Sequence, residues 1–119
     1  MATVLWIDDD PAILELHGTL LRSKGYEVFT APDGISGIAI TRQRHIDVVV
    51  LDINMPGMDG LEVCHRLLAA SPGIRVLMVT GRDSEEDPLR AAAVGARGLL
   101  TKPISLATLR DEILRALAN

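Results

Sequence analysis

Two continuous apolar runs in this chain lead directly into carboxylates. The first covers residues 4–7 and is followed by aspartates at 8–10, and the second covers residues 48–51 and is followed by Asp52, with Asn54 two positions later. Uninterrupted apolar runs are typical of strands buried on both faces, as in parallel sheets. Ligands of such sheets bind outside the carboxyl ends of the strands. We therefore expect the acids to meet in one pocket, where a cation would offset the repulsion that otherwise raises at least one carboxyl pKa.

Length and composition are those of a single small domain. The chain has 119 residues and is 48% apolar, enough for one core without disulfides or a structural metal. We expect residues 1–119 to form one domain. The net charge of -4 and the scattered basic residues argue against direct nucleic-acid binding. The apolar runs are too short for a membrane span, and no signal-peptide pattern occurs in residues 1–25, so we expect a cytoplasmic protein without membrane contact.

Strand-like and helix-like segments alternate along the whole chain. This alternation favours an α/β fold with helices wound around a parallel sheet. The predicted strands cover residues 3–7, 27–31, 47–51, 75–80 and 98–101.

The first helix has a well-marked start and end. Asp10 followed by Pro11 predicts an N-cap and a first helical residue, and Gly25 predicts the end. The apolar face of this helix is expected to consist of Ile13, Leu16 and Leu20.

Similar signals mark the other four helices. The second is predicted to follow residues 33–34, and the third to follow residues 59–60 and to end before Ser71. The fourth is predicted to begin at Pro88 with Asp87 as its cap, which leaves residues 81–87 as a polar loop. The fifth begins after Ser105, and its buried face is expected to comprise Leu106, Leu109, Ile113 and Leu117.

Two further strand ends carry polar groups that complement the acids. One strand ends in Thr80 and Gly81, and the last ends in Lys102 and Pro103. Taken alone, a threonine is a common strand residue and a lysine a common solvated turn residue. Together with the acids, however, the strand ends supply a carboxylate nucleophile, a hydroxyl donor and an ammonium. The acids also supply the hard oxygen ligands that suit octahedral Mg²⁺, whereas Asp10 is better explained as a helix cap.

Four segments, in order along the whole chain, carry a resemblance to a known family. They are Asp8-Asp9, residues 51–60, residues 79–81 and residues 100–103. Together they resemble the receiver domain of two-component response regulators. The resemblance implies a flavodoxin-like, doubly wound, five-stranded parallel sheet of order 2-1-3-4-5 with five helices. The lysine-proline bond of this family is often cis, which Pro103 permits here.

The resemblance also implies a phosphoacceptor role for the carboxylate that ends the third strand. Asp52 would take a phosphoryl group from a histidine kinase, a phosphotransfer protein or a small phosphodonor, as an aspartyl phosphate. Lys102 and Thr80 would hold phosphoryl oxygens, with help from the backbone N–H groups of Ile53 and Gly81. Phosphoryl transfer needs mainly positioning and charge neutralisation, which these groups supply. The domain would catalyse only its own phosphorylation and dephosphorylation.

A Mg²⁺ site is implied beside the phosphoacceptor. Asp9 and Asp52 would bind the ion through their side chains, and Asn54 would bind it through its backbone carbonyl. Asp8 would act directly or through water. These are the ligand types that Mg²⁺ prefers.

Signalling in this family mostly uses the face formed by the fourth helix, the fifth strand and the fifth helix. The resemblance therefore implies that a homodimer partner or a downstream effector binds there. Leu99 stands where the family usually has an aromatic residue that swings inward on activation, and Ile104 stands where phenylalanine is common. We expect Thr80 and the loop at residues 81–87 to transmit the change instead.

Several other side chains are expected to have structural roles only. Cys64 lies on an apolar helical stripe and is interpreted as a small core residue. His17, His45 and His65 fall on helices or at a helix end and are expected to be solvated. Trp6, in the first predicted strand, has no assigned role.

Two other functions compete with the receiver hypothesis. In a phosphohydrolase of the haloacid-dehalogenase kind, Asp8 and Asp10 would be the nucleophile and the acid. The chain lacks a substrate-capping segment, however, and Asp10 with Pro11 forms a helix start. A pseudo-receiver would bind partners without phosphorylation, which the intact set of acids, threonine and lysine opposes.

Overall fold

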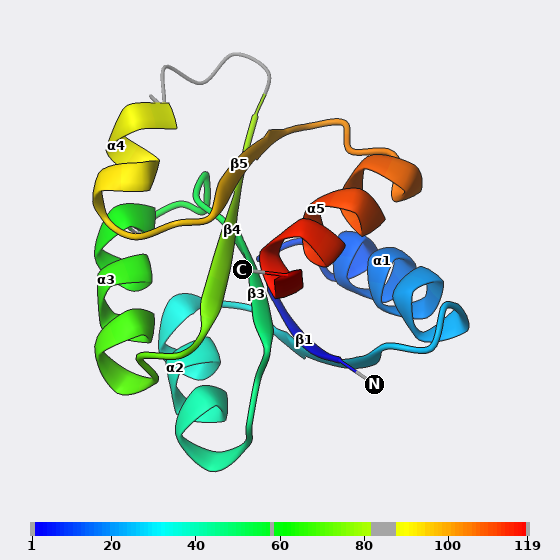
Figure 1. The fold of residues 1–119 in the computed structure, drawn as a ribbon, viewed down its shortest axis with the longest axis horizontal. Coiled ribbons are helices and arrows are strands. Elements are labelled where there is room, and N and C mark those ends of the chain that lie inside the picture. Colours follow the sequence, from blue (N-terminus) through cyan, green and yellow to red (C-terminus); the bar gives the residue numbers. More distant parts are fainter. Residues whose placement is uncertain (1, 58, 82–87, 119) are drawn as a thin grey trace.

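The structure, a computed structural model, describes residues 2–57, 59–81 and 88–118. Within these residues, strands and helices alternate along the chain, as predicted (Figure 1). In chain order the elements are β1 (Thr3–Ile7), α1 (Pro11–Ser23), β2 (Glu27–Ala31), α2 (Gly34–Gln43), β3 (Val48–Asp52), α3 (Gly60–Ala70), β4 (Arg75–Thr80), α4 (Pro88–Ala93), β5 (Gly98–Thr101) and α5 (Leu106–Ala118).

The strands form one parallel sheet in the order β2-β1-β3-β4-β5. Figure 1 shows α1 and α5 on one face of the sheet and α2, α3 and α4 on the other. This is the flavodoxin-like, doubly wound arrangement that the resemblance implied. Because every strand runs in the same direction, all the strand ends named above lie along one edge of the sheet.

The third strand is shifted by one residue from its predicted bounds. The prediction of residues 47–51 is wrong at both ends, since β3 spans Val48–Asp52. At the start, Asp47 uses its side chain to accept a hydrogen bond of 2.8 Å from the Thr3 backbone N–H. At the end, pairing with the long strand β4 continues, and Asp52 lies opposite Val79. Asp52 is therefore held by the sheet itself.

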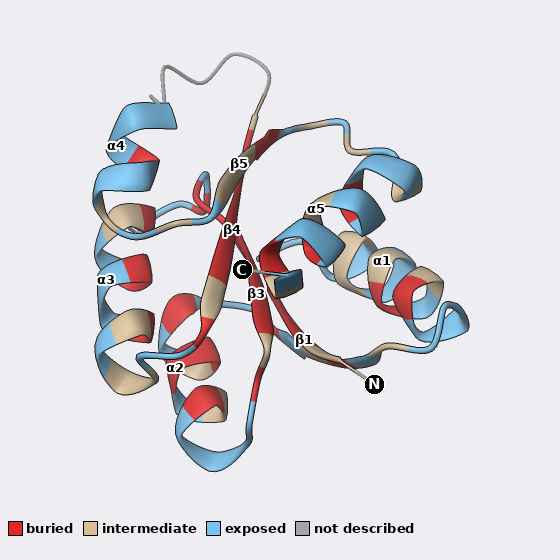
Figure 2. Cartoon of the chain, viewed as in Figure 1, coloured by how far each residue is buried: buried red, intermediate tan, exposed pale blue. Residues whose placement is uncertain are grey.

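The sheet supplies apolar side chains to a core on each of its faces. Figure 2 shows most of the sheet in the colour of buried residues. Successive strand residues point to opposite faces, so one continuous apolar run fills both cores. In β1, Leu5 and Ile7 face the core under α2 and α3, and Val4 and Trp6 face the core under α1 and α5. No helix among the described residues combines the length and apolar character of a membrane span.

Helix α1 begins and ends as predicted but buries a different face. Asp10 is its N-cap and accepts a bond from the Ala12 N–H, and Gly25 follows the C-cap with a φ of 94°. The prediction that Leu16 belongs to the buried face is wrong, because this residue is 54% exposed whereas Leu21 is fully buried. The two positions lie about 140° apart around an ideal helix, and the sheet covers the face that contains Leu21.

The starts of the other helices agree with their sequence signals. Asp33 and Asp59 cap α2 and α3, α4 begins at Pro88, and the Ser105 hydroxyl oxygen accepts a bond from the backbone of Thr108 in the first turn of α5. The predicted cap at Asp87 and residues 82–87 of the predicted loop lie outside the described residues. On α5, Leu109, Ile113 and Ala116 are buried, whereas Leu106 and Leu117 are only partly buried.

A glycine at the start of α3 lets this helix pack closely beside the end of β3. A Cβ atom at Gly60 would overlap the side chain and backbone of Ile53. The absence of a side chain therefore lets the start of α3 lie directly against Ile53, the residue that follows Asp52.

Candidate functional site

Three of the strand-end acids meet at the carboxyl edge of the sheet, as predicted. Asp8, Asp9 and Asp52 each offer a carboxylate oxygen, and these oxygens all lie within 4.8 Å of one another. Asp8 is 1% and Asp52 3% exposed, whereas Asp9 is exposed. The register brings them together, because Ile7 at the end of β1 lies opposite Leu51 in β3.

The environment of Asp8 fits a hard cation. One of its oxygens, Oδ1, accepts a 3.0 Å hydrogen bond from the Asp10 N–H, while the other, Oδ2, is buried without a partner. Burial raises the pKa of Asp8 above its ordinary value, and the charge of Asp52 adds to this rise. Clustered carboxylates with an unpartnered oxygen are the donor set that a divalent cation such as Mg²⁺ satisfies.

Asp52 is held by contacts to both of its carboxylate oxygens. Its Oδ1 accepts a 2.9 Å bond from the Asn54 N–H, and its Oδ2 lies 2.7 Å from Lys102 Nζ. Burial alone would lower the pKa of Lys102, but the hydrogen bond and charge of Asp52, with the charges of Asp8 and Asp9, raise it. The ammonium is therefore firmly charged beside the buried carboxylate. The Lys102–Pro103 peptide bond is cis.

Asn54 has a side-chain role that the sequence reasoning missed. Its Oδ1 accepts a 3.2 Å hydrogen bond from the Thr80 hydroxyl and a second bond from the Gly81 N–H. The only signal in the sequence was an amide side chain close to a strand end. The amide oxygen gathers the two donors that were predicted to hold a phosphoryl group. The third predicted donor, the Ile53 N–H, donates to the Val79 carbonyl at 2.9 Å.

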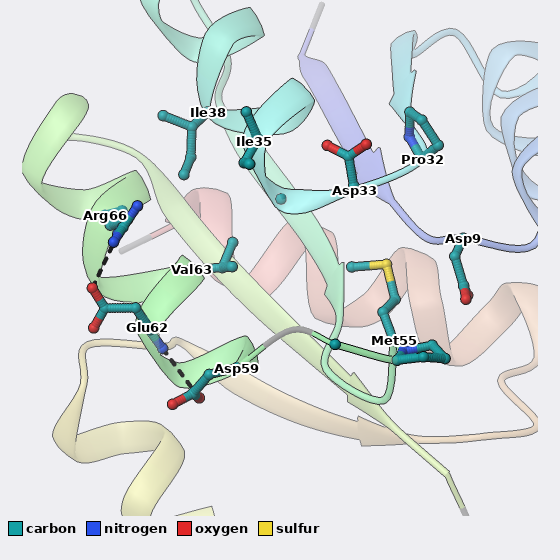
Figure 3. Close-up of a pocket in the computed structure, with 13 residues that line it drawn as sticks. Asp9, Pro32, Asp33, Ile35, Ile38, Met55, Asp59, Glu62, Val63 and Arg66 are labelled. Carbon is teal, nitrogen blue, oxygen red and sulfur yellow. Dashed lines mark hydrogen bonds and ion pairs between the residues drawn. The ribbon is translucent and has the colours of Figure 1, made fainter.

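A pocket of about 380 Å³ opens beside the acids. Figure 3 shows Asp9 and Met55 on one side of it and Ile35, Val63 and Glu62 on other sides. A second pocket, of about 590 Å³, lies between α1 and the connection from β5 to α5, and its lining includes Trp6, His17 and Lys102. The acid cluster is thus open to solvent near Asp9 and closed by side chains around Asp8.

The structure corrects the prediction for one histidine. His45 and His65 are exposed, as expected. His17 is not solvated: its ring stacks on Trp6 with 4.5 Å between centroids and 4° between planes, and burial lowers its pKa. The signal was present in the sequence, because His17 lies four residues from both Ile13 and Leu21 on the side of α1 that faces the sheet.

The single cysteine is a core residue, as predicted. Cys64 is fully buried on α3, and burial raises the pKa of its thiol to about 11. A thiol in this state is not a nucleophile.

Comparisons with known proteins identify relatives along the whole chain. A family model described as the response regulator receiver domain matches residues 4–114. The chain is 38% identical to Protein PilH of Pseudomonas aeruginosa, with 100% of each chain covered. It is 42% identical over 104 residues to the probable transcriptional regulatory protein TcrX of Mycobacterium tuberculosis and spans 44% of that protein's length. Among solved structures, the chemotaxis protein CheY4 of Vibrio cholerae matches with a TM-score of 0.90 and 36% identity over 98% of this chain and 99% of that chain.

Proposed function

Because the chain belongs to the family of response regulator receiver domains, which are phosphoacceptors of two-component signalling, we propose that Asp52 is the residue that accepts the phosphoryl group. The observation that carries this proposal is the 2.7 Å contact between Lys102 Nζ and Asp52 Oδ2. Of the three clustered acids, Asp52 is the one that accepts a hydrogen bond from the Lys102 ammonium in the structure. The ammonium can neutralise an oxygen of the incoming phosphoryl group.

The transfer is a nucleophilic displacement at phosphorus. A carboxylate oxygen of Asp52 forms the new bond to phosphorus, and the bond from phosphorus to the donor's nitrogen or oxygen breaks, with the electron pair leaving on the donor. The product is an acyl phosphate on Asp52, which water later hydrolyses. The protein thus acts on its own side chain.

The residues around Asp52 bind and orient the phosphoryl oxygens. Lys102 leaves the carboxylate and contacts a phosphoryl oxygen. The Thr80 hydroxyl and the Gly81 N–H leave the Asn54 amide oxygen and donate to a second phosphoryl oxygen. The Ile53 N–H can contribute only in competition with its bond to Val79. Fixed donors of this kind stabilise the charge that develops on the equatorial oxygens.

The acids hold a Mg²⁺ ion in this proposal. Asp9 and Asp52 bind it through side chains, Asn54 binds it through its backbone carbonyl, and Asp8 acts directly or through water. When bound, the ion neutralises charge on the phosphoryl group and on the clustered carboxylates. The raised pKa and the unpartnered oxygen of Asp8 support this assignment.

The partners follow from the phosphorylation chemistry. A cytoplasmic histidine kinase or phosphotransfer protein supplies the phosphoryl group, and the α4-β5-α5 face meets a second copy of the domain or an effector. Leu99 on β5 is packed partly buried against the core below α4. Thr80 lies opposite Thr101 in β5, and its carbonyl accepts a 2.8 Å hydrogen bond from the Lys102 N–H. A displacement of Thr80 is therefore the route by which the change reaches this face.

Incubation with acetyl phosphate and Mg²⁺, followed by borohydride trapping and peptide mapping, tests the proposal. We expect one modified residue, Asp52, and no modification of an Asp52→Asn variant. Asp111→Asn, an exposed change on α5, is the control and should label normally. Label on Asp8 would contradict the assignment, and a wild-type protein that never labels would indicate a pseudo-receiver.

A further inference from the structure

Trp6 carries a buried hydrogen-bond donor without a partner. Its side chain is 1% exposed in the core that α1 and α5 cover, and the indole Nε1 makes no hydrogen bond in the structure. Buried polar groups in folded proteins are rarely left unpaired. A phenylalanine would fill much of the same space without burying an N–H group, so packing alone does not explain a tryptophan at this position.

A matching acceptor lies on the same side of the same chain segment. Trp6 and Asp8 are two positions apart at the end of β1, where alternate side chains point in one direction. Asp8 Oδ2 is buried and unpartnered, and the third such atom recorded among the described residues is Nδ1 of His17. The three unpaired buried atoms thus belong to one group of neighbouring side chains. Burial raises the pKa of Asp8, and the Trp6 indole is among the groups that oppose this rise.

The orientation of the indole is fixed by the stack with His17. The two rings are 4.5 Å apart at their centroids and nearly parallel. Burial lowers the pKa of His17, so the ring that stacks at neutral pH is the uncharged one. Both residues line the pocket between α1 and the β5–α5 connection, and without the imidazole ring the indole could tilt into that space.

We infer that Trp6 is a positioning residue for the metal site: its indole N–H donates to Asp8 Oδ2 when that carboxylate is charged and engaged with a divalent cation, and His17 holds the indole in the required orientation. The inference rests on the proposed function, since it needs the acids to bind Mg²⁺. Partners that hydrogen-bond to metal ligands fix the orientation of those ligands, and their loss typically weakens metal affinity by about 10- to 100-fold.

The sharpest test removes the indole N–H and leaves the shape of the side chain. The chain has a single tryptophan, so benzothienylalanine, with sulfur in place of the N–H group, can replace it selectively. We expect calorimetric titration with MgCl₂ to give a dissociation constant at least about tenfold weaker than that of the unmodified protein. Trp6→Phe should weaken binding to a similar degree. An unchanged constant in a folded benzothienylalanine protein would overturn the inference.

A second readout follows the indole proton itself. A single tryptophan gives a single indole resonance in a nitrogen–proton correlation spectrum. We expect this resonance to move downfield on addition of MgCl₂, as the N–H group engages the charged carboxylate. The movement should be absent in Asp8→Ala, and an indole resonance that ignores the ion in the wild-type protein would contradict the proposed hydrogen bond.

Variants of neighbouring residues separate positioning from general destabilisation. His17→Phe keeps a stacking ring and should retain wild-type Mg²⁺ affinity, whereas His17→Ala loses the stack and should bind more weakly. Tyr26→Phe changes a polar aromatic residue packed against the same core and should not alter affinity. Equal weakening in Tyr26→Phe and His17→Phe would show a nonspecific effect and overturn the inference. If the unmodified protein binds no Mg²⁺, the metal site itself is refuted, a result distinct from equal binding by all variants.

Discussion

Lys102 Nζ lies 2.7 Å from Asp52 Oδ2, although the two residues are 50 positions apart in the chain. The contact crosses from the end of β5 to the end of β3, over β4, and joins the cation of the site to the carboxylate at the last position of β3. It is the main attractive interaction in a cluster of three acids.

Lys102→Met should destabilise the metal-free protein and suppress phosphorylation. The variant leaves a buried carboxylate without its charged donor, and losing one partner of such a bond costs about 1 to 3 kcal/mol. Because the remaining acids then lack a cation, MgCl₂ should restore more stability to this variant than to the wild type. Denaturant unfolding in EDTA and in MgCl₂ measures both effects. Lys24→Met, on the exposed C-cap of α1, is the control and should behave as the wild type in both buffers.

Asp9→Ala should have opposite effects on metal binding and on metal-free stability. Removing a hard ligand should weaken Mg²⁺ binding strongly, since few protein ligands remain. In EDTA, however, the variant loses a like charge and should unfold at a higher temperature. Relief of a repulsion of about 0.5 kcal/mol would raise the midpoint by roughly 2 to 4 °C. A lowered midpoint would show that the acids are not clustered in solution, and Asp111→Ala should leave both properties unchanged.

Asp8→Asn should become stabilising as pH rises. Burial raises the folded-state pKa of Asp8 above the ordinary value of 3.8, so the folded protein binds this proton more tightly than the unfolded chain. The contribution of Asp8 to stability is therefore full below pH 3.8 and is lost as pH rises through the raised pKa. In EDTA, the free energy of unfolding of Asp8→Asn should match that of the wild type near pH 3.8 and exceed it at pH 7.

Asp47→Asn provides the opposite sign within the same chain. Burial alone would raise the pKa of Asp47, but the Thr3 N–H and His45 bring it below its ordinary value of 3.8. Its stabilising contribution is present above pH 3.8 and is lost as pH falls through the lowered pKa. Asp47→Asn should therefore be destabilising at pH 7 and less so at acidic pH. If Asp8→Asn and Asp47→Asn changed the free energy of unfolding in the same direction as pH rises, the structure's environments for Asp8 and Asp47 would be contradicted.

Phosphorylation should change amide exchange most in residues 81–95, of which 82–87 lie outside the described part of the chain. The physical reason is that Thr80 and Gly81 must leave Asn54 to reach a phosphoryl oxygen, which disturbs the backbone that leads to α4. Hydrogen exchange with and without beryllofluoride, a phosphoryl mimic, measures the change. Leu99→Tyr should enlarge this change in amide exchange. A tyrosine ring can occupy a different position in each of the two states, and its contacts would then differ between them. A change confined to α1 or α2 would contradict this account.

The order of helices and strands along the chain was predictable because its signals are local, whereas the order of the strands in the sheet came from the resemblance to a family. The caps Asp10, Asp33 and Asp59 and the proline at the start of α4 act within one turn, so a single sequence contains them. The edge at which the acids meet also follows from strand direction alone. The roles within that edge came from the resemblance to a family and not from the residues themselves.

What the sequence did not reveal depends on contacts between elements. The face of α1 that is covered is set by how the helix lies on the sheet, which is why Leu16 was wrongly placed inside and His17 wrongly placed in solvent. The hydrogen bonds from Thr80 and Gly81 to the Asn54 side chain join the end of β4 to the segment that follows β3. Local periodicity contains no information about contacts between residues so far apart in the chain. The end of β3 was also missed, because it depends on the length of the neighbouring strand β4.

The Asn54 amide oxygen gives the unphosphorylated protein a resting state of its own. Thr80 and Gly81 already have an acceptor there, so their donors are satisfied before the phosphoryl group arrives. Spontaneous excursions toward the active arrangement must break these bonds without a replacement, and such excursions become rarer with each bond that must open. We therefore expect Asn54→Ala, which removes this acceptor, to make the active arrangement more populated in the unphosphorylated domain, so that signalling would begin without any kinase.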